Sequence, residues 1–151
     1  MNLRDLKLNR LDGGPEGHHF SARRLSDDVG SKLTGMGIYE LEPGQGAWPY
    51  HFELGDEEWL IVIDGELTLR TPDGERVLVA GDVVCFPAGA SGAHAVRNHS
   101  DATVRYAMPS AAPKYGTGVV YPDSGKFLLY GPGFEHRGYL GEEADYWEGE
   151  P

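Results

Sequence analysis

Short apolar or alternating segments, each roughly five to eight residues long, follow one another along most of the chain. Turn-forming residues bound nearly all of these segments, and Pro72, Asp73 and Gly74 form a typical hairpin turn between two of them. Leu3, Leu6 and Leu11 suggest one short helix near the start, whereas no segment after residue 20 has helical apolar spacing over a sufficient length. The pattern therefore predicts an all-β domain, with a sandwich, a barrel and a jelly roll all open.

The segment EWLIVID is apolar on both of its faces. Every second residue of a strand points the same way, so Leu60 and Val62 share one face, and Trp59, Ile61 and Ile63 share the other. One face can line a barrel, and the second face needs a covering layer. We expect either the C-terminal segment or another subunit to cover it, and therefore expect a homodimer.

The chain after residue 110 is rich in glycine, aromatic and acidic residues. Residues 111–151 are too few to form a core of their own, so we expect an extension that wraps the barrel or a partner subunit. The predicted division is a single domain, 1–151, with its core at about 34–110. The side chains expected to make the contacts of the extension are Phe127, Leu128, Tyr130, Tyr146 and Trp147.

The overall charge limits the classes of partner. The chain of 151 residues carries 24 acidic residues against 13 Lys and Arg, and its net charge is −11. Binding to nucleic acid or to an anionic membrane surface needs a basic face, so we expect neither partner. The single cysteine, Cys85, excludes a disulfide within the chain and is expected to be buried in a strand. With no signal-like or membrane-spanning apolar block, we expect a cytoplasmic location.

Two histidines and two glutamates have spacings that can bring them together. His51 and Glu53 are two residues apart and point to the same side of a predicted strand. Glu58 begins the next strand, which can run alongside, and His94 begins another strand after a glycine-rich turn. Imidazole and carboxylate ligands together suit a divalent ion such as Mn, Fe, Co, Ni or Zn, and do not choose among them.

Four acidic residues lie within six positions beside this apolar segment. We expect Glu53 and Glu58 to point inward, and Asp56 and Glu57 to lie in the turn between them and face water. Without a cation, the two inward carboxylates would repel each other and raise each other's pKa. A divalent metal is therefore expected to stabilise the fold.

These residues resemble the two sequence motifs of the cupin superfamily, which are separated here by 15 residues. The resemblance implies a double-stranded β-helix, the jelly-roll barrel of cupins, with N- and C-terminal extensions. It also implies a divalent metal, Fe, Mn, Ni or Zn, held by His51, Glu58 and His94, and by Glu53 in place of the usual second histidine of the first motif. The matching positions are Gly46, His51, Glu53, Glu58 and Gly65 in the first motif, and Gly81, Pro87, Gly89, His94 and Asn98 in the second.

The resemblance favours a metal-dependent enzyme acting on a small molecule, with dioxygenase-type or sugar or keto-acid isomerase-type chemistry. A non-catalytic cupin that binds a small molecule or a metal is the alternative, and an interaction module using the Trp59 face is a third. Arg70, Arg97 and Arg105 are the nearby cations that could hold a carboxylate or phosphate. The expected substrate-pocket residues are Trp48, Tyr50, Arg70, Phe86 and Tyr106.

Overall fold

The computed structural model describes residues 1–111, 116–141, 143, 145 and 148–149. These residues form mostly antiparallel strands, which confirms the predicted all-β class. Their helical segments are α1 (Ser26–Val29) and a 3-10 turn at Ala90–Gly92. The short helix expected near the start is not formed, and residues 9–11 are a strand instead.

None of the helices in the described part of the chain has the length and apolarity needed to cross a lipid bilayer.

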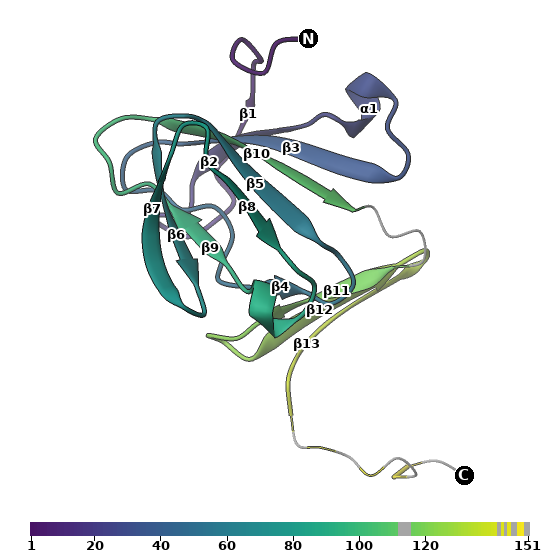
Figure 1. Cartoon of the computed structure of the whole chain (residues 1–151). Helices are drawn as coiled ribbons and strands as arrows, with labels where there is room; N and C mark the ends of the chain where they lie inside the picture. The colour runs from purple at the N-terminus through teal and green to yellow at the C-terminus, as the bar shows by residue number, and fades with distance from the viewer. Residues whose placement is uncertain (112–115, 142, 144, 146–147, 150–151) are drawn as a thin grey trace.

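The largest sheet of the described chain contains the strands β1 (Asn9–Leu11), β2 (Phe20–Arg24), β3 (Thr34–Leu41), β10 (Val104–Ala111), β5 (Glu58–Asp64) and β8 (Val83–Phe86). Their order in the sheet is β1-β2-β3-β10-β5-β8 (Figure 1). β10 lies between β3 and β5, so residues far apart in the sequence are hydrogen-bonded neighbours. This crossover is what turns a series of short strands into a barrel wall.

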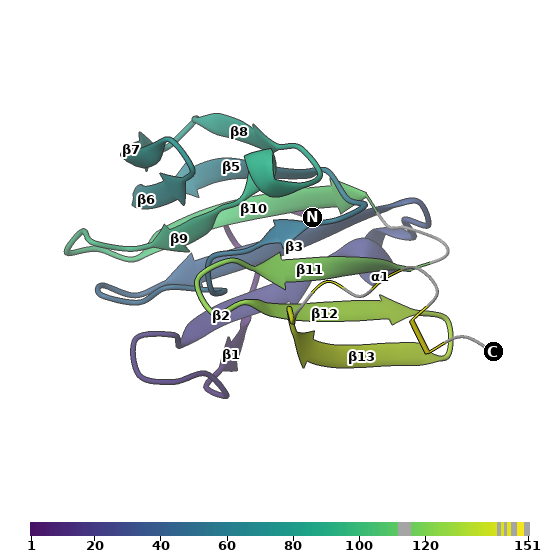
Figure 2. The same cartoon turned by 90° about the horizontal axis from the view of Figure 1, so that it is seen from below.

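Two smaller sheets complete the barrel. Their strands are β6 (Glu66–Thr71), β7 (Gly74–Val79) and β9 (Ala95–Arg97) in one sheet, and β4 (Phe52–Glu53), β11 (Thr117–Tyr121), β12 (Lys126–Gly131) and β13 (Phe134–Tyr139) in the other. Pairing of Thr71 with Gly74 confirms the predicted hairpin. The sheet β13-β12-β11-β4 lies at the lower end in Figure 1, and Figure 2 shows its strands from below. The extension therefore pairs with β4, the strand that carries Glu53. The expected contacts of Tyr146 and Trp147 lie outside the described residues.

The barrel interior is filled by alternate residues of the central strands. Leu60 and Val62 are buried there, as their predicted face requires. Burial of each such side chain contributes about 1.5–3 kcal/mol to folding. Asn98 is also fully buried, and its amide donates to the carbonyls of Leu41 at 2.9 Å and Ala102 at 2.7 Å. The interior cluster consists of Phe20, Leu41, Ala47, Leu60, Val62, Leu67, Leu69, Leu78, Phe86, Val96, Val104, Tyr106 and Met108.

The N-terminal segment covers the outer face of β5, where we expected either the C-terminal segment or another subunit. Ile61 and Ile63 pack against a second buried cluster to which Leu6 belongs. Arg105 ties this segment to the barrel, because its guanidinium donates to the carbonyls of Leu3, Arg4 and Leu6 and pairs with Glu40. Trp59 lies beyond this cover with 43% of its surface exposed. The homodimer stays a prediction.

Cys85 is exposed, and its predicted burial is wrong. β8 ends the six-stranded sheet, and its alternate residues Val84 and Phe86 face the interior. Cys85 therefore points to the outer side together with Val83, which is 53% exposed. An apolar neighbourhood in the sequence does not reveal which face of an edge strand is covered.

Candidate metal centre

His51 and His94 lie side by side because their main chains pair. The N–H of His51 donates to the carbonyl of His94 at 3.1 Å, and the N–H of His94 donates to the carbonyl of His51 at 2.8 Å. Both residues are buried, and their ring centroids are 4.7 Å apart. A two-way bridge of this kind brings together two side chains that are widely separated in the sequence.

A main-chain carbonyl two residues earlier orients each imidazole. Nδ1 of His51 lies 2.7 Å from the carbonyl oxygen of Pro49, and Nδ1 of His94 lies 2.9 Å from that of Gly92. A carbonyl can only accept, so Nδ1 carries the proton in both rings. Nε2 of each ring therefore keeps its lone pair, which is the atom and the state that bind a metal.

Two further contacts fix the position of His94. The ring of Phe86 stacks on the imidazole with centroids 3.7 Å apart and an angle of 8° between the planes. Gly92 approaches the Pro87 carbonyl so closely that an added Cβ would lie only 1.8 Å from its oxygen. Only glycine fits at this position, and its carbonyl is the one that accepts from His94.

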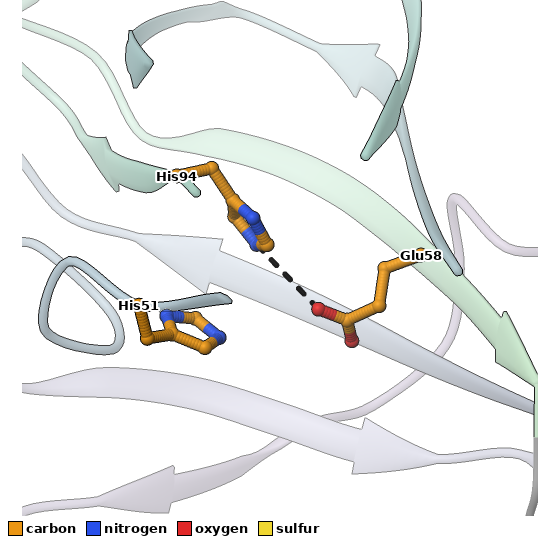
Figure 3. Close-up of side chains that lie close together, drawn as sticks. All are labelled: His51, Glu58 and His94. Carbon is orange, nitrogen blue, oxygen red and sulfur yellow. Dashed lines mark ion pairs between the residues drawn. The ribbon is translucent and has the colours of Figure 1, made fainter. Parts of the chain in front are cut away.

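Glu58 completes a group of three converging side chains (Figure 3). It is the first residue of β5, its side chain is 18% exposed, and its Oε2 lies 3.6 Å from Nε2 of His94. One ligand atom from each of His51, Glu58 and His94 lies within 4.8 Å of the others. Bonds of about 2.1 Å to one ion would place such atoms up to roughly 4 Å apart, so a small inward movement would complete the site.

Several buried polar atoms at this site have no hydrogen-bond partner among the described residues. They include Oε2 of Glu58, Nε2 of His94 and Oε2 of Glu53. Leaving such atoms buried and unpaired is costly, and nearly all buried polar groups in proteins have a partner. A divalent cation bonded to two or three of them would remove this cost. The donor atoms present therefore fit a transition metal of the imidazole- and carboxylate-binding class.

Glu53 is near this group but not part of it. Its strand β4 pairs with β11, where Glu53 lies opposite Val119. Burial, together with the charges of Glu58 and Asp56, raises the pKa of the Glu53 carboxyl to about 8. The carboxyl therefore lies close to the site, while its predicted role as the fourth ligand stays a prediction.

The acidic residues between the two strands differ in their environment. Glu57 is exposed, as expected, whereas the expectation that Asp56 faces water is wrong because Asp56 is only 6% exposed. Its Oδ1 is buried without a partner in the described chain, and burial raises its pKa. Burial and the charge of Asp56 together raise the pKa of Glu58 to about 7. Three carboxyl groups thus lie where negative charge is unfavourable without a cation.

Both histidines are neutral at physiological pH. Burial lowers the pKa of His51, and the hydrogen bond to Pro49 opposes this only in part. Burial, together with the neighbouring His51, lowers the pKa of His94 to about 4. Neutral imidazoles need no deprotonation before they bind a metal.

Two tyrosines from the extension reach the acidic cluster, and we did not predict their contribution. The ring of Tyr121 lies 6.0 Å from that of His51. Burial raises the pKa of Tyr121 and of Tyr130, and in both cases the charge of Glu53 raises it further. These residues belong to β11 and β12, outside the two motifs, so no spacing in the sequence links them to the histidines.

A cavity of about 400 Å³, here called the chamber, opens beside Glu58. Trp48, one of the expected substrate-pocket residues, lines it, and its role in substrate binding stays a prediction. Tyr106 is fully buried next to the chamber and stacks on Tyr39 with ring centroids 5.2 Å apart. The chamber is lined by Asn9, Leu11, Ala22, Arg23, Arg24, Gly35, Met36, Gly37, Tyr39, Trp48, Glu58, Met108 and Ser110.

Tyr50 and Arg70 lie in a different cavity, which does not include Glu58. Arg70 forms two hydrogen bonds with the carboxylate of Asp123, at 2.7 Å and 2.9 Å. Its guanidinium carbon lies 3.9 Å from the centroid of the Tyr50 ring. This second cavity has a volume of about 320 Å³. The structure therefore does not bring these two residues to the three converging side chains.

Part of the chain is similar in sequence to a known enzyme. Over 73 residues the chain is 39% identical to quercetin 2,3-dioxygenase of Bacillus subtilis (strain 168), a match that covers 47% of the chain. The chain spans only 21% of the length of that enzyme.

Two solved structures share the fold over nearly the whole chain. One is a suggested sugar phosphate isomerase from Acidithiobacillus ferrooxidans, with a TM-score of 0.82, 23% identity, and coverage of 95% of this chain and 93% of the other. The second, from Silicibacter pomeroyi, is a sugar phosphate isomerase from a cupin superfamily. Its TM-score is 0.80 at 23% identity, and the match covers 92% of this chain and 91% of the other. The cupin domain family matches residues 37–108, which include His51, Glu58 and His94. The motif-based recognition is thus confirmed, and the chain carries a cupin domain.

Proposed function

We propose that the chain is a metal-dependent enzyme that acts on a small molecule held in the chamber. His51, Glu58 and His94 would hold a divalent transition metal, Fe, Mn, Ni or Zn, with Glu53 as a further carboxylate. One observation carries this proposal: donor atoms of these three residues lie within 4.8 Å of one another, and those of Glu58 and His94 are buried without partners. Such an arrangement is costly unless a cation occupies it.

A metal at this site would supply a Lewis acid with open positions for a ligand oxygen or for O₂. The chain's own residues would position the ligand and limit the access of water. Trp48 and Met108 provide apolar wall, and the neutral imidazoles leave the metal most of its charge. Burial raises the pKa of Tyr39, so its hydroxyl keeps its proton and can donate a hydrogen bond to a ligand oxygen.

Dioxygenase-type and isomerase-type chemistry are both supported by relatives. The similarity to a quercetin dioxygenase supports the first, and the fold shared with sugar phosphate isomerases agrees with the second. One observation supports the alternative, a non-catalytic binding module: Glu53 lies outside the converging group. A homodimer and a cytoplasmic location stay predictions.

Metal analysis tests the proposal directly. The protein is purified without chelator, reloaded separately with Mn, Fe, Ni and Zn, desalted, and measured by mass spectrometry. We expect near-stoichiometric metal in the wild type and a loss of most of it in His51→Ala and His94→Ala. His99→Ala is the matched control because His99 is exposed and outside the group. Less than a tenth of an equivalent of every metal in the wild type would refute the proposal.

Activity assays then separate the two chemistries and the alternative. Oxygen consumption is measured with flavonols, diols and keto acids, and isomerisation is followed by proton exchange in sugar phosphates and keto acids. Metal-dependent turnover that His94→Ala abolishes would support an enzyme. A fully loaded protein that binds ligands but turns over none of them would favour the non-catalytic binding module.

A further inference from the structure

Arg24 lies at the mouth of the chamber, in line with the inward-facing residues of β2. Phe20 and Ala22 occupy alternate positions before it and pack against the interior cluster. Arg24 therefore lies on the same face of β2, two residues beyond Ala22 and outside the buried interior cluster. Arg24 and Glu58 both line the chamber.

The register of the sheet places Arg24 three strands away from Glu58. Arg24 pairs with Gly37, Gly37 pairs with Met108, and Ser110 on the same strand as Met108 pairs with Glu58. Three spacings of about 4.8 Å, with an offset of two residues along β10, set the two main chains on the order of 16 Å apart. Both residues line the chamber, so one small molecule within it can reach both side chains.

Gly37 has no side chain, and the ring of Tyr39 occupies the space that a side chain at this position would take. A Cβ added at Gly37 would lie 2.5 Å from the Tyr39 hydroxyl oxygen. Burial and the charge of Glu58 raise the pKa of Tyr39, while a hydrogen bond with Trp48 and the charge of Arg24 lower it. The hydroxyl is thus within electrostatic reach of both Glu58 and Arg24, which places a proton donor between the two ends of the chamber.

Arg24 differs from the other arginines near the site because, within the described residues, no hydrogen bond or ion pair engages its side chain. Its neighbour Arg23 is paired with Asp28 at 2.9 Å. The three cations that we expected to hold an anion are all engaged: Arg70 by Asp123, Arg97 by the Gly44 carbonyl, and Arg105 by Glu40.

The charges that face the chamber favour an anion at this position. A divalent metal would offset Glu58, and Asp28 offsets Arg23, which leaves the guanidinium of Arg24 uncompensated. The net charge of −11 disfavours the binding of anions to the protein as a whole. The positive charge of Arg24 would favour an anionic ligand locally, at the opening of the chamber. Guanidinium binds carboxylates and phosphates through paired, charge-assisted hydrogen bonds.

We propose that Arg24 is the anchor for an oxyanion, a carboxylate or a phosphate, at the end of the ligand remote from the metal. The ligand would then be a small anionic molecule with oxygen donors at the metal end and the charged group at the mouth. This proposal rests on the proposed function for the identity of the site, and it assigns the substrate class and a specificity-determining residue that lies outside both motifs.

The test compares matched charged and neutral probes by calorimetric titration at near-physiological salt. Dihydroxyacetone phosphate and dihydroxyacetone form the phosphate arm, and glycerate and glycerol form the carboxylate arm. The variants are Arg24→Gln, Arg24→Lys, and Arg76→Gln as a control that removes the same charge from an exposed position outside the chamber. Metal content is measured on every sample.

We expect Arg24→Gln to weaken binding of an anionic probe about tenfold or more, and to leave the neutral probes unchanged. Arg24→Lys should retain most of the preference, and Arg76→Gln should change it less than twofold. Weaker binding in only one of the two arms, phosphate or carboxylate, still supports Arg24 as the anchor and identifies the anion. Wild type without a preference for either charged probe, or an equal loss in Arg76→Gln, would overturn it.

The metal measurement keeps the two proposals separate. An anion preference that depends on Arg24 in a chain that binds no metal would support the anchor and refute the metal-dependent function. A fully loaded chain with no such preference would keep the metal centre and overturn the anchor.

Discussion

Replacing Glu53 by glutamine should stabilise the metal-free protein at pH 8 and weaken its hold on a metal. Burial and the charges of Glu58 and Asp56 together raise the pKa of Glu53 to about 8. Glutamine keeps the shape of the side chain and removes its charge, so the repulsion disappears. The same change removes a negative group that would compensate a bound cation. The two effects should therefore have opposite signs.

The size of the first effect follows from linkage. The pKa of Glu53 is about 8 in the folded chain against an ordinary value of 4.5, so between these pH values the folded chain binds the proton more tightly than the unfolded chain. The free energy of unfolding therefore falls as the pH rises through this window. A full conversion at about 1.4 kcal/mol per pH unit would give ~5 kcal/mol. Glu53 is only partly buried, so solvent screening reduces this to about 1–2 kcal/mol, or about 3–6 °C in Tm.

Differential scanning calorimetry in chelator and in saturating metal measures both effects. The comparison is best made above pH 6.5, because the lowered pKa of His94, about 4, makes stability rise with pH between about 4 and 6.5. Glu53→Gln should exceed the wild type in Tm at pH 8, match it near pH 5, and gain less from metal. Glu57→Gln is the control because Glu57 is exposed. A Glu53→Gln protein that is less stable than wild type at pH 8 without metal would refute this reasoning.

Three further outcomes are expected. Metal affinity should rise about fivefold between pH 6 and pH 7, because binding displaces the proton from Glu58, whose pKa is raised to about 7; a flat profile in chelator competition would contradict this. Gly92→Ala should cost about 3 kcal/mol in urea unfolding and lower the metal content, because its Cβ would collide with the Pro87 carbonyl and disturb His94. Leu6→Ala should cost about 2 kcal/mol and leave the metal content unchanged, since Leu6 packs only in the outer cluster; a loss of metal would show that the cover and the site are coupled.

The three converging residues could be predicted from the spacing of the motif positions, although their meeting depends on distant segments. His51 lies in an isolated bridge with His94, and the first residue of β5 carries Glu58 to the same end of the barrel. The glycine-rich turn before His94 returns the chain to pair with His51. Glu53 shares the direction of His51 in the sequence, but its strand of two residues pairs with β11, a partner that no motif includes.

The remaining features depend on contacts between distant segments. Periodicity shows that Ile61 and Ile63 share a face with Trp59, but it does not show that residues near Leu6 cover that face. The same limit explains Cys85, whose exposure depends on β8 being at the edge of the sheet. Arg24 was not a candidate because its approach to Glu58 depends on the cross-strand register through β3 and β10.

The orientation of both histidines by main-chain carbonyls has a consequence for how this protein could evolve. A side-chain partner can be deleted by one substitution, whereas the main-chain carbonyl of Pro49 remains in any variant that keeps the backbone path. Gly92 is the exception, because only glycine fits beside the Pro87 carbonyl. In a saturation library of these two loops, metal retention should therefore tolerate most substitutions except those of Gly92. Under the proposed function Trp48 lines the ligand chamber, so ligand preference would change in the same library. The metal centre and the choice of ligand can thus diverge independently, and new substrates can be selected without rebuilding the centre.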